Sequence, residues 1–260
     1  MFTSTQKIAQ RLLPVLAVLL AGTTTQAEDR YALVIGNSEY AEQPLKNPIN
    51  DARVMKEKLE ALDFDVTMKL DLDRKQMRAA MRQFNRRLPT DSIACVFFAG
   101  HGMRVDNRNY LVPIGSSFTE VWELEDETIT EDYIRKMIQA SRSRVNILIL
   151  DCCLNNPFQD RAWRGRSAVT PLDFIHSPSI EGTATIYSTA NGKRAEDGEG
   201  QNSPFTDALA RALTLRPEGG LKLDDALKVV DRIMVTERGR DQKPHVTFDL
   251  SVMDFQLYVT

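Results

Sequence analysis

A histidine and a cysteine in this sequence each follow an apolar run, and together they could form a base and a nucleophile. His101 comes after Val96–Phe98, between two glycines, and Cys153 comes after Val145–Leu150. A cysteine whose proton passes to a neighbouring histidine is a common nucleophile of hydrolases. Spacing and local chemistry alone leave a catalytic dyad and a structural pair equally open.

The two-residue period of a β-strand separates the two adjacent cysteines at this position. If the strand continues past Leu150, Asp151 and Cys153 point to one side and Cys152 points to the other. A nucleophile and a carboxylate would then share one face. Cys153 is therefore the candidate nucleophile.

Alternating apolar patterns predict the elements that would position these side chains. Short apolar runs bounded by turn residues predict buried strands, and apolar residues at helical spacing predict helices between them. The expected strands are 31–35, 66–70, 93–98, 145–150, 183–187 and 253–258, and the expected helices are 50–62, 73–88, 131–138, 204–213 and 223–235. In an open parallel sheet the ligand crevice lies beyond the carboxyl ends of the strands, where His101 and Cys153 would both lie.

This alternation predicts one α/β domain over residues 28–260, with a mostly parallel central sheet covered by helices on both faces, a three-layer sandwich. The composition is that of an ordinary globular protein, with 42% hydrophobic and 27% charged residues.

Residues 1–27 have the features of a secretory signal peptide. Lys7 and Arg11 precede the apolar run 12–22, and Thr25-Gln26-Ala27 offers small residues for cleavage before Glu28. We therefore expect an exported protein with no membrane partner after cleavage. A permanent N-terminal anchor is the alternative.

Charge and cysteine usage exclude several functions. Removal of residues 1–27 would change the net charge from −3 to about −5, which disfavours nucleic acid as a partner. The three cysteines and three histidines lack the spacing of a metal site, so we expect no metal and no other cofactor. The sequence gives no indication of an oligomeric state.

Several motifs together resemble the caspase-like peptidases of bacteria, which are relatives of the metacaspases. The matching segments are Ala32–Asn37, Asn50-Asp51-Ala52, Phe98-Ala99-Gly100-His101-Gly102, Leu150–Phe158, Asp197–Gly200 and Asn202–Phe205. The resemblance covers essentially all of residues 28–260, and it implies the caspase-hemoglobinase-like fold. With a bacterial resemblance, export would lead to the periplasm or outside the cell.

The resemblance implies a cysteine endopeptidase that cuts a peptide or protein substrate after Arg or Lys. Cys153 would be the nucleophile and His101 the general base and acid, and the backbone N–H groups of Gly102 and Cys153 would form the oxyanion hole. Asp51, Asp151 and Ala99 would line the primary substrate pocket. For Asp51, a carboxylate that interacts with a helix start is an almost equal alternative.

Two departures from the family pattern leave a second function open. Leu154 and Ala99 stand where relatives commonly have polar side chains, so the pocket should be more apolar than usual. The alternative is a catalytically inactive caspase-like binding or regulatory module. A nucleotide-binding domain and a serine hydrolase are disfavoured because their glycine-rich motifs are missing.

Overall fold

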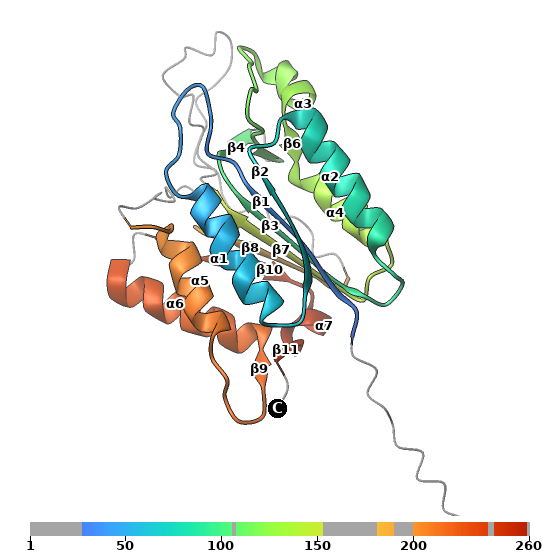
Figure 1. Ribbon diagram of the computed structural model, residues 1–260, viewed down its shortest axis with the longest axis vertical. Helices are drawn as coiled ribbons and strands as arrows, with labels where there is room; N and C mark the ends of the chain where they lie inside the picture. The colour runs from blue at the N-terminus through green and yellow to red at the C-terminus, as the bar shows by residue number, and fades with distance from the viewer. Residues whose placement is uncertain (1–27, 106–107, 153–180, 190–199, 239–241, 259–260) are drawn as a thin grey trace, which may run out of the picture.

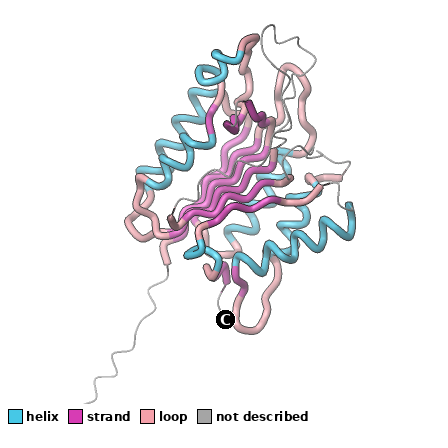
Figure 2. Tube along the Cα trace, turned by 180° about the vertical axis from the view of Figure 1, so that it is seen from behind, coloured by secondary structure: helices cyan, strands magenta, loops and turns pink. Residues whose placement is uncertain are grey.

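A six-stranded sheet forms the centre of the molecule in the computed structural model, which describes residues 28–105, 108–152, 181–189, 200–238 and 242–258 (Figures 1 and 2). The strand order is β10-β8-β7-β3-β1-β2. The bounds are β1 (Arg30–Gly36), β2 (Asp65–Leu70), β3 (Ile93–Ala99), β7 (Val145–Asp151), β8 (Thr183–Tyr187) and β10 (His245–Phe248). All neighbouring pairs are parallel except β10 with β8.

Helices cover both faces of this sheet, which confirms the predicted three-layer α/β sandwich (Figure 1). The helices are α1 (Pro48–Glu60), α5 (Pro204–Leu213) and α6 (Leu223–Arg238) on one side, with α2 (Arg74–Arg87) and α4 (Glu131–Gln139) on the other. Alternate residues of β3 serve the two layers: Phe97 packs in the core under α1 and α5, and Phe98 packs in the core under α2 and α4. Both side chains are fully buried, as expected for a strand inside a parallel sheet.

Local sequence explains why two of the helices begin where they do. Asp73 precedes α2 and forms a capping box with Gln76, so each accepts a hydrogen bond from the other's backbone N–H. Ser203 precedes α5, its hydroxyl accepts from Thr206 N–H, and Pro204 occupies the first helical turn, where it needs no donor.

The prediction for the last strand was wrong in its start and its place. Residues Leu250–Met253 form the short helix α7, and only β11 (Gln256–Tyr258) is a strand. It pairs with β9 (Leu221–Lys222) in a separate two-stranded sheet. The last edge of the main sheet is instead β10, which the sequence analysis did not predict because its four residues are only half-buried.

A second small sheet lies after β3 and was also missed. It contains β4 (Gly102–Val105), β5 (Arg108–Leu111) and β6 (Ile129–Thr130), in antiparallel pairs. The 3₁₀ helix η1 (Val121–Glu123) and the α-helix α3 (Leu124–Glu127) lie between β5 and β6. These elements are too short for a periodic pattern to show in the sequence.

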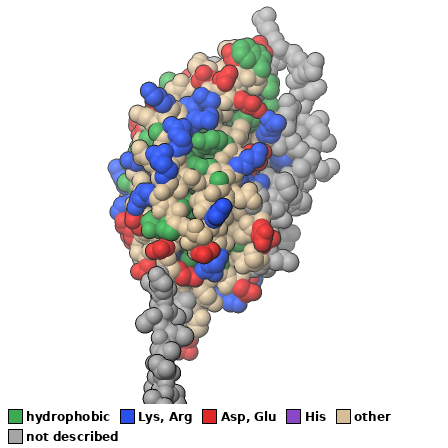
Figure 3. Space-filling view, turned by 90° about the vertical axis from the view of Figure 1, so that its right-hand side faces the viewer, with side chains coloured by type: hydrophobic (Ala, Val, Ile, Leu, Met, Phe, Trp, Pro, Cys, Tyr) green, Lys and Arg blue, Asp and Glu red, His purple; other side chains and the backbone are tan. Residues whose placement is uncertain are grey.

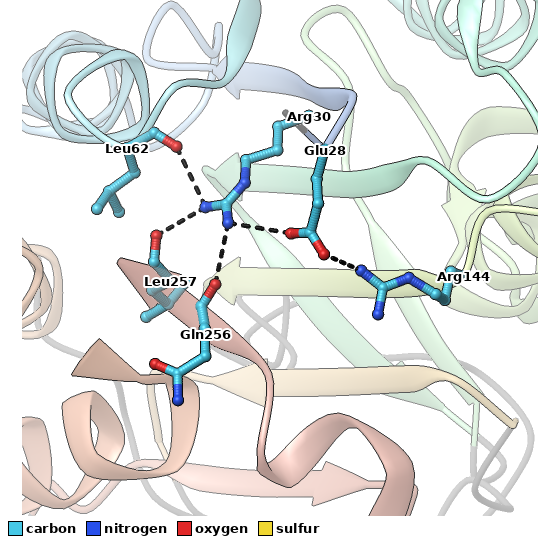
Figure 4. A network of polar contacts seen from close by, with 6 residues as sticks. All are labelled: Glu28, Arg30, Leu62, Arg144, Gln256 and Leu257. Carbon is cyan, nitrogen blue, oxygen red and sulfur yellow. Dashed lines mark hydrogen bonds and ion pairs between the residues drawn. The ribbon is translucent and has the colours of Figure 1, made fainter. Parts of the chain in front are cut away.

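The guanidinium of Arg30 joins the start of β1 to the C-terminal part of the chain (Figure 4). It donates to the carbonyl oxygens of Leu257 at 2.7 Å, Gln256 at 3.1 Å and Leu62 at 3.3 Å. Glu28 lies beside it and also pairs with Arg144.

No helix within the described residues is long and apolar enough to span a bilayer.

Candidate active site

The predicted site residues that the structure describes lie at the carboxyl edge of the central sheet. Gly36, Ala99 and Asp151 are the last residues of β1, β3 and β7, and they are register neighbours across the three strands. His101 follows β3 at this edge, and Asp51 lies in the first turn of α1. The described candidates therefore come from three separate parts of the chain, the start of α1 and the ends of β3 and β7, and lie along one edge, as the parallel topology requires.

Tyr40 and Gln43, in the segment between β1 and α1, hold His101 in place. The backbone N–H of His101 donates to the Tyr40 hydroxyl at 2.9 Å, and that hydroxyl donates to the carbonyl of Val112, also at 2.9 Å. The two rings contact each other with centroids 4.4 Å apart. His101 is 8% exposed and Tyr40 7%, so the contact is buried.

The carbonyl oxygen of Gln43 lies 2.7 Å from Nε2 of His101 and determines which nitrogen carries the hydrogen. A carbonyl oxygen only accepts, so Nε2 must be the donor. In the neutral imidazole, Nδ1 is then the nitrogen that can take up a proton. A base with one nitrogen fixed in this way is oriented for proton transfer through the other.

Gly100 makes room for the Tyr40 hydroxyl. A Cβ atom added at position 100 would lie 2.6 Å from that oxygen and 2.9 Å from the ring of Phe98. Any larger residue would therefore displace the hydroxyl that binds His101. Burial raises the pKa of Tyr40 far above its ordinary value, so this hydroxyl stays protonated and can donate to Val112 at every physiological pH.

Asp51 and Asp151 are joined by a third residue, Ser203. The backbone N–H of Ser203 donates to Oδ1 of Asp51 at 2.9 Å, and the Ser203 hydroxyl donates to Oδ2 of Asp151. Asn202 adds a bond to the same oxygen of Asp51 at 2.9 Å, and Thr206 adds one to the same oxygen of Asp151 at 2.6 Å. Both carboxylates are buried, at 1% and 7% exposure. The start of α5 thus connects two acidic groups that are far apart in sequence.

These contacts give both acids a structural role beside any pocket role. Asp51 lies in the first turn of α1, as the helix-start alternative expects, and it also binds the segment before α5. Asp151 accepts from two side chains at the start of α5, although the sequence showed no structural reason for a carboxylate there. Ala99 pairs with Asp151 in register and lies in the core under α1 and α5, the layer in which Asp151 accepts its hydrogen bonds from α5.

The cysteines divide as the strand period predicts, as far as the structure describes them. Cys152 is buried in the core under α2 and α4, on the face opposite to Asp151. Cys95 lies in the middle of β3, and burial raises the pKa of its thiol to about 12. Cys153 and Leu154 lie outside the described residues, so the dyad and its oxyanion hole remain predictions. Gly102 begins β4 and pairs with Leu111.

Sequence reasoning gave no site role to Tyr40, Gln43 or Ser203, although Ser203 lies in the matching segment Asn202–Phe205. Ser203 carried a usable signal, because a serine directly before a proline and an apolar helix is a common helix start. Tyr40 and the Gln43 carbonyl carried none, because their contacts with His101 span 61 and 58 residues.

Comparison with protein families and curated relatives gives consistent results. The sequence model described as "Caspase domain" matches residues 29–254. The human mucosa-associated lymphoid tissue lymphoma translocation protein 1 is 33% identical over 134 residues, which are 50% of this chain and 16% of that protein. Its mouse homolog is 31% identical over 128 residues, or 49% of this chain and 15% of that protein. The matched region is thus a small part of these relatives.

Solved structures share the fold. The crystal structure of the Drosophila initiator caspase Dronc matches with a TM-score of 0.63, over 87% of this chain and 82% of that one, at 12% sequence identity. At that identity the likeness concerns the path of the backbone.

Proposed function

Because this chain belongs to the caspase-domain family of cysteine peptidases, we propose that it is an endopeptidase that cuts on the carboxyl side of arginine or lysine. The observation that carries the proposal is the pair Asp51 and Asp151, buried and joined through Ser203 at the sheet edge that holds His101. This pairing of basic specificity with the fold corresponds to the metacaspase-like branch.

The proposed chemistry uses Cys153 and His101. The thiol of Cys153 gives its proton to Nδ1 of His101, and the thiolate attacks the scissile carbonyl carbon. The backbone N–H groups of Gly102 and Cys153 would stabilise the oxyanion, where the loss of one donor typically costs about 10²–10³ in rate. The imidazolium returns its proton to the leaving amine, and water then hydrolyses the acyl-enzyme. The Gln43 carbonyl supports the step by keeping the hydrogen on Nε2.

Electrostatics supports the proposed specificity. A guanidinium or ammonium group beside Asp51 and Asp151 would offset the cost of keeping two carboxylates away from water. A neutral side chain in the same place would bring no positive charge to offset the desolvation of the carboxylates, so it should bind poorly. Ala99 adds an apolar wall, which suits the aliphatic part of an arginine or lysine side chain.

The proposed setting is outside the cytoplasm. The support is the pattern of residues 1–27, which is that of a secretory signal peptide. A peptide or protein is the proposed partner in catalysis, and no cofactor is part of the mechanism.

A peptide panel tests the proposal. Peptides with arginine, lysine, aspartate or alanine before the cut bond are offered to the wild type and to Cys153→Ala. We expect hydrolysis of the arginine and lysine peptides only, and none by Cys153→Ala. Hydrolysis of none of the four by wild type would favour the inactive binding module, and equal hydrolysis of the alanine peptide would contradict the acidic pocket.

The role of the acids is tested by Asp151→Asn. This change keeps the size of the side chain and removes the charge, so kcat/KM for the arginine peptide should fall by about a hundredfold. Asp126→Asn is the matched control, because Asp126 is an exposed acid in α3. Equal effects of the two substitutions would show that net charge, and not the pocket, governs the rate.

A further inference from the structure

The helix α2 carries a positive charge that the rest of the molecule does not share. Six of its 14 residues are Lys or Arg and none is acidic. The whole chain has a net charge of −3, so the residues outside α2 carry −9. In a protein of negative net charge, one strongly cationic helix concentrates positive charge on one side of the molecule. An anionic partner is attracted to that side.

The cations of α2 form a stripe on its outer side. Lys75, Arg78, Arg82 and Arg86 follow one another at spacings of three or four residues, so they share one helical face over about 16 Å. We call these four residues the α2 basic stripe. Lys75, Arg82 and Arg86 are exposed, and within the described part of the chain none of the three has an ion pair with a carboxylate. No carboxylate among the described residues therefore neutralises their charge.

The adjacent helix α4 extends this surface. Lys136 is exposed on α4 and Arg142 is exposed just after it, while Arg78 lies over the ring of Tyr133 at 4.5 Å. In Figure 1 the two helices lie side by side on the sheet. Figure 3 shows Lys and Arg side chains over the upper and middle part of the face they form, with Asp and Glu side chains at its top and in its lower part. The opposite layer differs: Lys56 and Lys58 on α1 are paired with acids of the same helix.

We propose that this face binds the anionic surface of a lipid bilayer. The cations are spread along the exposed faces of two neighbouring helices and are not grouped around one point. They therefore suit an extended plane of negative charges better than a single small anion. A nucleic acid that reached beyond α2 and α4 would meet a molecule with a net charge of −9 outside α2. A bilayer touches only the one face.

The place where the chain enters the domain supports a membrane as the partner. Glu28 pairs with Arg144, which follows α4, and Arg87 at the end of α2 lies over the ring of Tyr31 at 5.7 Å. Residue 28 is therefore beside the basic face. If residues 1–27 are a retained anchor, the alternative to a cleaved signal peptide, the apolar run 12–22 would precede this face directly. The expectation of no membrane partner after cleavage concerned residues 1–27, whereas the basic face arises only when α2 and α4 pack side by side.

Vesicle co-sedimentation of the full-length protein tests the proposal. Phosphatidylcholine vesicles are compared with vesicles of equal parts phosphatidylcholine and phosphatidylglycerol, so binding by an apolar segment contributes to both. We expect preference for the anionic vesicles, lost at high salt. One Lys or Arg near an anionic surface is worth about fivefold in partition coefficient, so Lys75→Gln/Arg82→Gln/Arg86→Gln should bind these vesicles roughly a hundredfold more weakly.

Matched variants separate the face from net charge and from folding. Arg53→Gln/Lys56→Gln/Lys58→Gln removes three charges from α1 in the other layer and should bind like wild type. Lys75→Arg/Arg82→Lys/Arg86→Lys keeps the charge and should also bind like wild type. Equal binding to both kinds of vesicle, equal losses in the two Gln variants, or release of the protein from anionic vesicles by equimolar duplex DNA or an acidic peptide would overturn the proposal.

Discussion

Removal of a single oxygen atom, in Tyr40→Phe, tests whether Tyr40 positions His101. The phenyl ring keeps its place against the imidazole, where the centroids are 4.4 Å apart. The backbone N–H of His101 and the carbonyl of Val112 both lose their bond to the hydroxyl. The substitution therefore separates ring packing from hydrogen bonding at one residue.

The expected cost follows from these two bonds. A buried backbone group left without a partner costs about 1–3 kcal/mol, so the loss of two such bonds should lower the free energy of unfolding by about 2–6 kcal/mol. For a domain of this size that lowers Tm by roughly 4–24 °C. A displaced imidazole should lower kcat on an arginine peptide by about ten- to a hundredfold. KM should change little, because Tyr40 does not contact Asp51 or Asp151 in any described hydrogen bond.

Tyr187→Phe is the matched control. Tyr187 is also buried, and its hydroxyl lies 2.9 Å from both carboxylate oxygens of Glu131, on the other side of the sheet from Asp151. This variant should lose stability while kcat stays near the wild-type value. Thermal unfolding and steady-state kinetics of both variants decide the matter. If Tyr40→Phe loses stability but keeps its kcat, or if both variants lose kcat equally, Tyr40 is only a structural residue.

Three further outcomes are expected. Burial raises the pKa of Cys95 to about 12, so at pH 8 only about one thiol in 10⁴ is ionised. Iodoacetamide should therefore label Cys153 long before Cys95. Mass spectrometry that finds equal labelling of both cysteines, unchanged in His101→Ala, would contradict an activated Cys153. Ser203→Ala removes the cap of α5 and a hydrogen bond to Asp151, and should lower the free energy of unfolding by about 2–4 kcal/mol in urea titration. An unchanged midpoint would refute the bridge. Arg30→Met should lower Tm by several degrees, because three backbone carbonyls lose a donor. Arg144→Met removes only an exposed ion pair and should lower the free energy of unfolding by under about 1 kcal/mol. Equal decreases of Tm in the two variants would argue against the role of Arg30.

The sequence predicted the elements whose patterns are long and regular. β8 and α5 begin and end at the predicted residues, and β1, β3 and β7 extend only by one or two. The residues of these four strands are buried on both faces of the sheet, so the apolar run itself marks the strand. The small sheet β4–β5–β6 and the strand β9 were missed. Strands of two to four residues form only by pairing with other strands, and the local sequence does not show which strands these are.

The candidate site was predictable in its composition and less so in its connections. Gly-His-Gly and Asp-Cys-Cys follow predicted strands, so their common edge could be deduced from parallel topology. The bridge from Asp51 to Ser203 joins residues 152 positions apart, and the contact of Tyr40 with His101 joins residues 61 apart. No periodic pattern encodes such pairs.

The sequence by itself determined the layered α/β fold, the edge where the chemistry would lie, and the opposite orientation of Asp151 and Cys152, because these follow from the period of a strand and the direction of parallel chains. Only the tertiary structure decided that Ser203 joins two acids, that Tyr40 and Gln43 hold the imidazole, and that the cations of α2 face outward beside those of α4. Such features arise when elements remote in sequence pack together, and the sequence contains the residues but not their distances.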